Sequence, residues 1–362
     1  MTSHSITATS PSTSSAPPKK PLLTRAVDRM TAACTTIGLD FVAPVVRLCR
    51  REDPRAQLNM LWRLLGVPLV AVVLFLLLWS QVSAGIQTSL GRIPGPSDVW
   101  QQAQALIVDH QAERARATAF YTREAARRAS RLAVDPAASV ATLTYTGRPT
   151  YIDQIGTSLA TVFTGFLLAS LIAIPLGILC GMSTIINAGI SPFIQIFRPV
   201  SPLAWLPIVT MVVSAVYVST DPFFAKSFIT SAVTVALCSL WPTLINTTHG
   251  VSSIDRDLLN VARVLRLSWT TKLFKVVIPS SLPLIFMGLR LSLGVGWMVL
   301  IAAEMLAQNP GLGKFIWDEF QNGSANSLAR IMVAVFTIGI IGFLLDRVMQ
   351  TIHTLVDFGA RR

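Results

Sequence analysis

Residues 158–181 read SLATVFTGFLLASLIAIPLGILCG, and this stretch decides the fold class of the 362-residue chain. It contains no charged residue, and a helix of about 20 apolar residues is long enough to cross the hydrocarbon core of a bilayer. Similar apolar stretches recur along a sequence that is 52% hydrophobic and only 13% charged. Because a chain in lipid must satisfy its backbone polar groups internally, these stretches are expected to be helices. We therefore predict an all-α membrane protein.

Six transmembrane helices are predicted from these stretches, a first at 64–84 and a five-helix core within 160–349. The core spans have approximate bounds of 160–182, 199–218, 228–248, 282–305 and 328–349. Prolines inside spans should kink the helices where neighbouring groups satisfy the freed carbonyls. These prolines are Pro68, Pro175, Pro207 and Pro242. No internal repeat is visible, so two inverted halves within one chain are not supported.

Basic residues set the predicted orientation, because short cytoplasmic loops carry an excess of Lys and Arg. Five arginines lie shortly before or at the start of the first span, and five basic residues follow the fourth span, whereas loops 219–227 and 306–327 hold one lysine each. Both termini are therefore predicted to be cytoplasmic. Residues 1–63 form a tail that is expected to be disordered at its start, where Ser, Thr and Pro dominate, and amphipathic afterwards. Residues 350–362 form the cytoplasmic C-terminus.

Residues 85–159 form a long insertion that is predicted to be periplasmic. It carries eight arginines, but loops longer than about 60 residues translocate largely regardless of their charge. A Ser97 N-cap, Asp98 after it and the Ala, Gln, Glu and Arg content of 98–133 predict a long helix with an apolar early face, an amphipathic periplasmic helix. This insertion is either a docking surface for a periplasmic partner or a solvated segment. The solvated segment is favoured, because charge runs usually form solvated faces.

The net charge of +12 suits basic span ends that meet anionic headgroups, so membrane lipids are predicted as partners and nucleic acid is not. The four histidines show no H-E-x-x-H spacing, and no Ser or Cys has a base beside it. This leaves no candidate catalytic residue and no metal site. A nucleotide-binding G-x-x-x-x-G-K-[ST] run is also missing, since Gly311–Lys314 is too short.

Residues 254–279, IDRDLLNVARVLRLSWTTKLFKVVIP, form a polar and basic segment between two spans. One face of its first part is apolar, because four residues follow the spacing i, i+3, i+4 and i+7. They are Leu258, Val261, Ala262 and Leu265. We predict a short amphipathic helix within 254–268 that lies across the membrane surface. An ordinary connector between two spans is the alternative.

This segment resembles the cytoplasmic signature of permease subunits of bacterial ABC importers, which reads E-A-A, three residues, G, nine residues, I-x-L-P. The aligned positions are Asn260, Val261, Ala262, Arg266, Val276, Ile278 and Pro279. The spacing matches throughout, whereas the Glu and Gly identities do not. In that family the segment is the coupling helix, which enters a groove of a separate ATPase subunit. Arg266 stands at the Gly position, and an arginine adopts a positive φ less easily.

The resemblance therefore implies an ATPase contact through Leu258, Asn260, Val261, Ala262, Leu265 and Arg266. Further stretches between 153 and 357 are similar to permeases for nitrate, bicarbonate, aliphatic sulfonates and taurine. They are residues 158–181, FRPVSPLAWLPI (197–208), PSSLPLIFMGLRLSLGVGWMVLIAAEML (279–306), GLGKFIWD (311–318) and IGFLLDRVM (341–349). Residues 260–265, 296–297, 304–306 and 315–318 look most like the nitrate type. The resemblance leaves out residues 1–63 and about 109–150.

Such a permease would form a homodimer in the bacterial inner membrane, bind two cytoplasmic ABC ATPase subunits and receive substrate from a periplasmic or lipid-anchored binding protein. The resemblance implies no cofactor in this chain, with ATP and Mg on the ATPases, and transport by alternating access. The expected substrate is a small inorganic anion, nitrate, while bicarbonate, cyanate and an aliphatic sulfonate or taurine stay open. A secondary transporter or channel is a remote alternative, and an intramembrane enzyme is more remote.

Candidate residues for the substrate path lie in the predicted span 282–305. Arg290, Trp297 and Glu304 are seven residues apart and fall along one drifting stripe. A guanidinium inside a span costs about 2.5–3.5 kcal/mol on insertion scales, which favours a solvated path or a partner. Arg290 would attract the anion and Glu304 would lie near the mouth. The alternative is a structural ion pair or a snorkelling side chain.

Two further path candidates precede or begin the third span, Arg198 and Trp205. Arg198 could equally anchor the span on the cytoplasmic side. Gly288, Ser292 and Gly296 form a row of small residues four apart, which predicts close packing against another helix.

Overall fold

The computed structural model describes residues 42–49, 53–88, 91–134, 143–218, 224–324 and 326–360. The prediction of a tail that is disordered at its start falls on residues outside these ranges. The chain divides into two compact units, Met1–Pro68 and Leu69–Arg362.

Unit 1 contains two short helices that pack on each other, α2 (Val42–Cys49) and α3 (Pro54–Leu61). A π-helical turn, η1 (Trp62–Gly66), leads from α3 into α4 (Val67–Gly85). A second π-helical turn, η2 (Leu273–Val277), occurs in unit 2. Each turn ends two residues before a proline, Pro68 or Pro279. Because proline has no N–H for the regular i to i−4 bond, a wider turn before it accommodates the missing donor.

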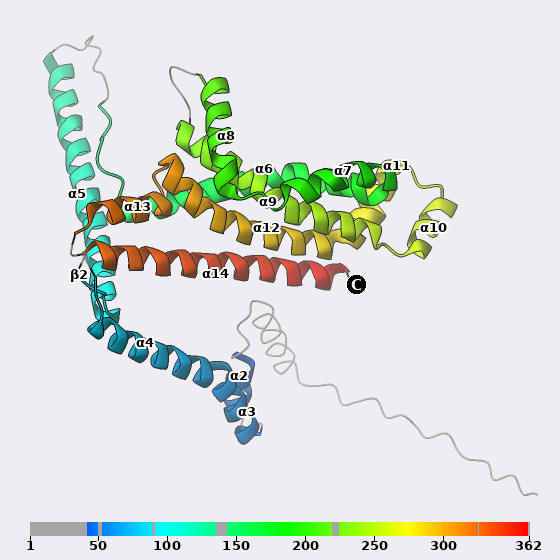
Figure 1. Cartoon of the computed structure of the whole chain (residues 1–362), viewed down its shortest axis with the longest axis horizontal. Coiled ribbons are helices and arrows are strands. Elements are labelled where there is room, and N and C mark those ends of the chain that lie inside the picture. Colours follow the sequence, from blue (N-terminus) through cyan, green and yellow to red (C-terminus); the bar gives the residue numbers. More distant parts are fainter. Residues whose placement is uncertain are drawn as a thin grey trace, which may run out of the picture. The chain divides into compact units, whose positions relative to one another are not determined.

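Unit 2 is helical apart from a short antiparallel hairpin of β1 (Gln87–Thr88) and β2 (Gly91–Arg92). Its further helices are α5 (Pro96–Val134), α6 (Tyr151–Met182), α7 (Thr184–Phe197), α8 (Pro202–Val216), α9 (Lys226–Ser252), α10 (Arg256–Val264), α11 (Trp269–Lys272), α12 (Ile278–Ala307), α13 (Leu312–Asn322) and α14 (Ser327–Ala360). Figure 1 shows α10 and the C-terminal end of α14 at one end of this unit, here named the α10 end. Helices α5 and α13 lie at the opposite end, named the α13 end.

Among the described residues, five helical stretches are long and apolar enough to cross a membrane. They are Pro54–Gly85, Tyr151–Met182, Lys226–Ser252, Trp269–Ala307 and Ser327–Val356. A sixth span exists only if α7 and α8 are counted together, and this pair is bent by 103°. The bend arises because Pro199 and Pro202 interrupt the helix, and Ser201 caps the new one by accepting a hydrogen bond from Leu203 N–H. The prediction of an all-α membrane protein is confirmed. The predicted third span, 199–218, corresponds to α8 alone, and only together with α7, which was not predicted, does it reach the length of a span.

Helices α6, α9 and α12 form the centre of unit 2. Small residues recur every fourth position along α6, at Gly165, Ala169, Ala173, Gly177 and Gly181. A Cβ atom at Gly165 would lie 2.6 Å from the carbonyl oxygen of Ala232 in α9, and one at Gly177 would lie 2.6 Å from Cβ of Thr247. The two backbones therefore touch along most of their length, as small-xxx-small faces allow in membrane helices.

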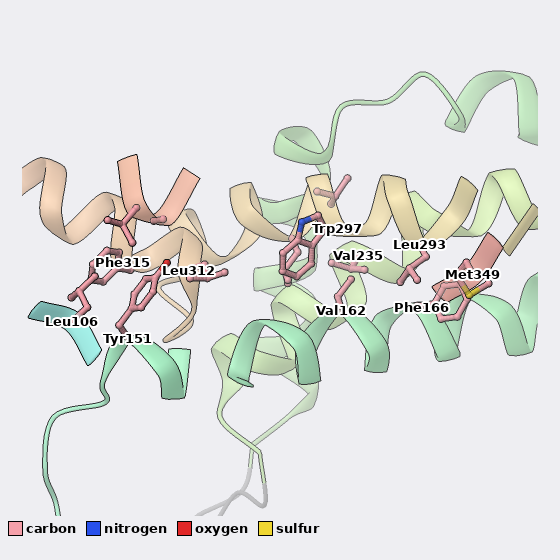
Figure 2. Packing of buried hydrophobic residues seen from close by; sticks show 14 of the residues in the cluster. Leu106, Tyr151, Val162, Phe166, Val235, Leu293, Trp297, Leu312, Phe315 and Met349 are labelled. Atoms are coloured by element: carbon pink, nitrogen blue, oxygen red, sulfur yellow. The ribbon is translucent and has the colours of Figure 1, made fainter. Parts of the chain in front are cut away.

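The predicted row of small residues on α12 also packs against α9. A Cβ atom at Gly288 would lie 2.8 Å from Cβ of Asn246, and one at Gly296 would lie 3.2 Å from a methyl group of Val235. Buried apolar side chains of α6, α9 and α12 fill the space beside this row, as Figure 2 shows for Val162, Val235 and Trp297. The prediction of close packing is confirmed, and the partner is a helix of the same chain.

The third member of that row, Ser292, repairs the break that Pro242 makes in α9. Its hydroxyl donates to the carbonyl oxygen of Ser239 and accepts from the N–H of Thr243 at 3.1 Å. A regular helix would join these two backbone groups to each other. A neighbouring side chain thus satisfies the backbone beside a proline, as predicted for the kinked spans.

Candidate functional site

Helix α10 covers the centre of the predicted segment 254–268. Asp255 caps its first turn by accepting a hydrogen bond from Asp257 N–H at 3.0 Å. At the other end, Leu267 N–H donates to Ala262 C=O at 3.1 Å and Arg266 N–H to Arg263 C=O at 3.0 Å. This pair of bonds is the Schellman motif, whose turning residue usually is glycine. Arg266 takes that place with a φ of 45°, so the turn forms despite the side chain.

The apolar residues of α10 divide between two faces. Leu258, Val261 and Leu265 are 49%, 56% and 64% exposed. Ala262 is only 3% exposed, and Leu259 packs against the buried cluster around Val277 at the end of η2. This corrects the prediction that Ala262 shares an exposed face with Leu258 and Leu265. The four predicted positions span a wide arc, and one edge of that arc packs on the chain itself.

The remaining predicted contact residues of α10 are free at its surface. Asn260 and Arg266 are both exposed. The exposed surface of α10, consisting of Leu258, Val261 and Leu265, therefore combines apolar side chains with polar and basic groups around them. Such a mixture suits contact with another protein more than burial within the chain.

Arg290 of α12 binds a residue that the sequence alone did not single out, Asp346 of α14. Its Nε and Nη2 atoms donate to the two carboxylate oxygens at 2.6 and 2.7 Å. The two side chains remain 36% and 49% exposed. The neighbouring Arg347 lies 5.4 Å from the ring centre of Phe343 and has no carboxylate within salt-bridge distance among the described residues. The Arg290, Asp346 and Arg347 cluster therefore has one positive charge in excess.

Trp297 is buried between α12 and α14, which corrects its prediction as a path residue. Its Nε1–H donates to the carbonyl oxygen of Ile338 at 3.0 Å, and a Cβ atom at Gly342 would lie 3.1 Å from the indole ring. Figure 2 shows the ring inside the apolar packing. The indole fills a gap over a glycine and satisfies its donor there, so it does not line an open path.

The exposed face of α12 carries other residues, which define the free α12 face. They are Met287, Leu291, Gly294 and Met298. Met298 is 75% exposed, and among the described residues nothing beyond the neighbouring residues and local backbone of α12 itself lies within 4 Å of a Cβ built on Gly294. The spacing i, i+4, i+7 and i+11 is a helix face that the sequence displays. It was missed because its residues carry no charge and look like ordinary membrane-span residues.

Glu304, predicted near the mouth of the path, is completely buried at the α13 end. Its carboxylate oxygens accept hydrogen bonds from Ser158 Oγ at 2.8 and 2.9 Å and from Gly313 N–H at 3.0 Å. No Lys or Arg lies within salt-bridge distance of it in the part of the chain that the structure describes. The carboxylate instead occupies the N-terminus of α13, where the helix dipole favours a negative charge.

Arg198 and Trp205 lie around the bend between α7 and α8. Arg198 is exposed and ends α7. The ring of Trp205 lies 5.7 Å from that of Phe197, which stacks on Trp241 at 6.3 Å. The predicted site residues thus occupy separate places, α10, the contact between α12 and α14, the bend and the α13 end, so the fold does not bring them into one site.

A cavity of about 800 Å³ lies at the α13 end, between α5, the segment 143–150 and α13. The segment returns from α5 and is fastened there, because His110 Nδ1 lies 2.6 Å from Thr150 Oγ1 and Arg114 pairs with Asp153. Tyr145 donates to Glu113 at 2.7 Å. This hydrogen bond lowers the pKa of Glu113 and raises that of Tyr145. Carboxylates and basic groups balance around the cavity, so it has no evident preference for an anion.

Helix α5 itself agrees with the predicted long helix in 98–133, beginning slightly earlier. Pro96 is its first residue, and Asp98 accepts a hydrogen bond from Gly95 N–H at 2.9 Å. Ser97, predicted as the N-cap, therefore lies just inside the helix. The carboxylate of Asp98 satisfies the backbone before the helix instead, as the acidic residue of a capping box does.

The chain is similar to a known family of membrane proteins. Residues 173–362, more than half of the chain, match the family described as binding-protein-dependent transport system inner membrane component. The chain belongs to this family. It is therefore the permease subunit of an ABC importer, a multi-pass membrane protein whose ATP hydrolysis takes place on a partner subunit. The predicted membership of this transporter class is confirmed.

Individual relatives are named as nitrate and bicarbonate permeases. The nitrate import permease protein NrtB of Synechococcus elongatus is 38% identical over 204 residues, which cover 56% of this chain and 69% of the relative. The bicarbonate transport system permease protein CmpB of a Synechocystis species is 40% identical over 203 residues, or 56% and 68% of the two chains. A solved structure of the inward-facing MetNI methionine ABC transporter is similar with a TM-score of 0.49 at 16% identity, covering 57% of this chain and 95% of that one.

Proposed function

We propose that this permease imports nitrate, with bicarbonate as the second candidate. The support is the similarity to relatives named for these two substrates, at 38% and 40% identity. Both substrates are planar oxyanions with a single negative charge. A path that suits one can therefore suit the other, and the similarity to the bicarbonate permease keeps that second candidate open.

The Arg290, Asp346 and Arg347 cluster carries this proposal within the structure. The fork of Arg290 already holds a planar carboxylate through two parallel N–H bonds. Nitrate and bicarbonate present the same spacing of two oxygens in one plane, so the fork fits them equally. Arg347 supplies the excess positive charge that remains after Asp346 is neutralised. The cluster is partly exposed, as a transient binding place requires.

The exposed surface of α10 is proposed to contact the ATPase. Its supports are the spacing of the coupling signature, the exposed apolar residues Leu258, Val261 and Leu265, and the formed turn at Arg266. Basic residues concentrate around α10, which favours a cytoplasmic position for the α10 end. Both termini would then be cytoplasmic, residues 85–159 periplasmic and the α13 end on the outer side.

The assembly follows from this orientation. Two copies of the permease would pair around an axis along the membrane normal and present two α10 helices to two ATPase subunits. The free α12 face would line the path between the copies, because its residues are exposed while other sides of α12 pack on α6, α9 and α14. A binding protein, either periplasmic or lipid-anchored, would deliver the anion at the α13 end.

Uptake by the reconstituted complex tests the proposed substrate. Proteoliposomes would contain the permease with its ATPase, and the binding protein would be added outside. We expect ATP-dependent uptake of labelled nitrate that an excess of taurine does not reduce. Bicarbonate uptake without nitrate uptake would select the second candidate. Uptake of taurine but of neither oxyanion would contradict the proposal.

A further inference from the structure

Within the described part of the chain, the polar groups that bind the Glu304 carboxylate are all hydrogen-bond donors. Ser158 Oγ–H and Gly313 N–H donate to the carboxylate, while Leu312 N–H donates to Ser158 Oγ at 2.9 Å and so fixes the hydroxyl as a donor toward Glu304. The carboxylate of Glu304 accepts from Ser158 and from Gly313 at once. One buried side chain of α12 thereby holds the first turn of α13 and one turn of α6.

Two glycines of the GLGKFIWD segment are required by the close packing at this contact. A Cβ atom at Gly311 would overlap the carboxylate of Glu304, and one at Gly313 would overlap the carbonyl oxygen of Ile301 in α12. Neither glycine has a positive φ, so conformational freedom does not explain them. The first turn of α13 is thus in direct contact with the last turns of α12, and any larger residue would push them apart.

Helix α12 connects this contact directly to α10. The chain passes from α10 through α11 and η2 into α12, and α10 packs on η2. The 30 residues of α12 then extend about 45 Å toward the α13 end, at 1.5 Å per residue. Helix α13 is tied in turn to α14, since Glu319 accepts hydrogen bonds from Ser327 Oγ at 2.9 Å and from Arg330 at 3.2 Å.

We propose that Glu304 is a positioning residue that makes α13 move together with α12, so that a displacement of α10 reaches the opposite end of the permease. Glu304 touches no substrate in this role. The inference rests on the proposed contact between α10 and the ATPase, but it does not depend on the identity of the anion. Helix α13 would change position at the outer side whenever the ATPases close.

Hydrogen exchange of the complete permease and ATPase complex in lipid nanodiscs tests this inference. Peptides from α10 and α13 would be compared in the nucleotide-free state and in the state trapped with ATP and vanadate. In the native complex we expect both helices to change their protection between the states. In Glu304→Gln, α10 should still change, while α13 should exchange at least about tenfold faster in both states and lose its response to nucleotide.

A matched control and a milder variant complete the test. Asp318→Asn also turns a carboxylate into an amide, here within α13. Among the residues that the structure describes, Asp318 bonds only Lys314 of the same helix, so this variant should behave as the native complex. Ser158→Ala keeps the carboxylate and removes one donor, so a partial loss of the α13 response is expected even if Glu304→Gln fails to assemble. An unchanged α13 response in both Glu304→Gln and Ser158→Ala would overturn the inference. If α10 of the native complex does not respond to nucleotide, the proposed ATPase contact fails, and the inferred role of Glu304 fails with it.

Discussion

Replacing Ser292 by alanine should destabilise the permease considerably, although the change removes only one hydroxyl group. Ser292 is completely buried, and its hydroxyl bridges Ser239 C=O and Thr243 N–H beside Pro242. The variant leaves both backbone groups without this partner. Hydrogen bonds between membrane helices contribute about 0.6 kcal/mol on average and at most about 1.7. Two of them give a loss of about 1.2 to 3.4 kcal/mol in the free energy of unfolding, or about an 8- to 300-fold change in the equilibrium constant.

The measurement is reversible unfolding of the purified permease in mixed micelles, followed by circular dichroism against the mole fraction of SDS. Ser281→Ala is the matched control, because Ser281 is equally buried in α12 but, in the described part of the chain, bonds only carbonyls of its own helical segment. Pro242→Ala should reduce the effect of Ser292→Ala, since a regular α9 can join its own backbone groups. Equal losses in Ser292→Ala and Ser281→Ala would refute the bridging role.

Three further outcomes follow from the structure. Arg266→Gly should raise the free energy of unfolding by about 0.5 to 1 kcal/mol, because glycine adopts the positive φ of this turn without a Cβ clash; an unchanged SDS midpoint would contradict this. Val261→Asp should abolish co-purification of the ATPase and leave the permease as stable as before. Ala262→Asp should instead lower the stability of the isolated permease, because it buries a charge. If Ala262→Asp loses the ATPase while the permease keeps its full stability, this division of α10 into an exposed and a buried side is wrong. Arg290→Gln should lower nitrate uptake at least about tenfold and also leave Asp346 without its partner, so adding Asp346→Asn should restore assembly but not uptake. Native uptake by that double variant would remove Arg290 from the path.

The long helices could be predicted from the sequence because hydrophobic span length and helix caps are local properties. The long helix after Pro96 and the short α10 agree with their predicted positions within a few residues. The second span ends where it was predicted, but α6 begins nine residues before the predicted start at 160. The row of Gly288, Ser292 and Gly296 also predicted close helix packing, since only small side chains permit it. The break between α7 and α8 lies at Pro199 and Pro202, where the third span was predicted to begin, so the helix that was missed is α7 before the break.

The roles of the predicted site residues depended on partners that are distant in sequence. Arg290 finds its carboxylate 56 residues later, and Glu304 finds its hydroxyl donor 146 residues earlier.

The periodicity of α10 likewise gives the width of its apolar arc. The packing of η2 decides which edge of that arc is covered, so Ala262 is buried while Val261 is exposed. A single sequence determines which residues a helix presents on each side, because the helical repeat is fixed by the backbone. Only the tertiary structure decides which side meets another helix, because that choice follows from the combined packing of all the helices.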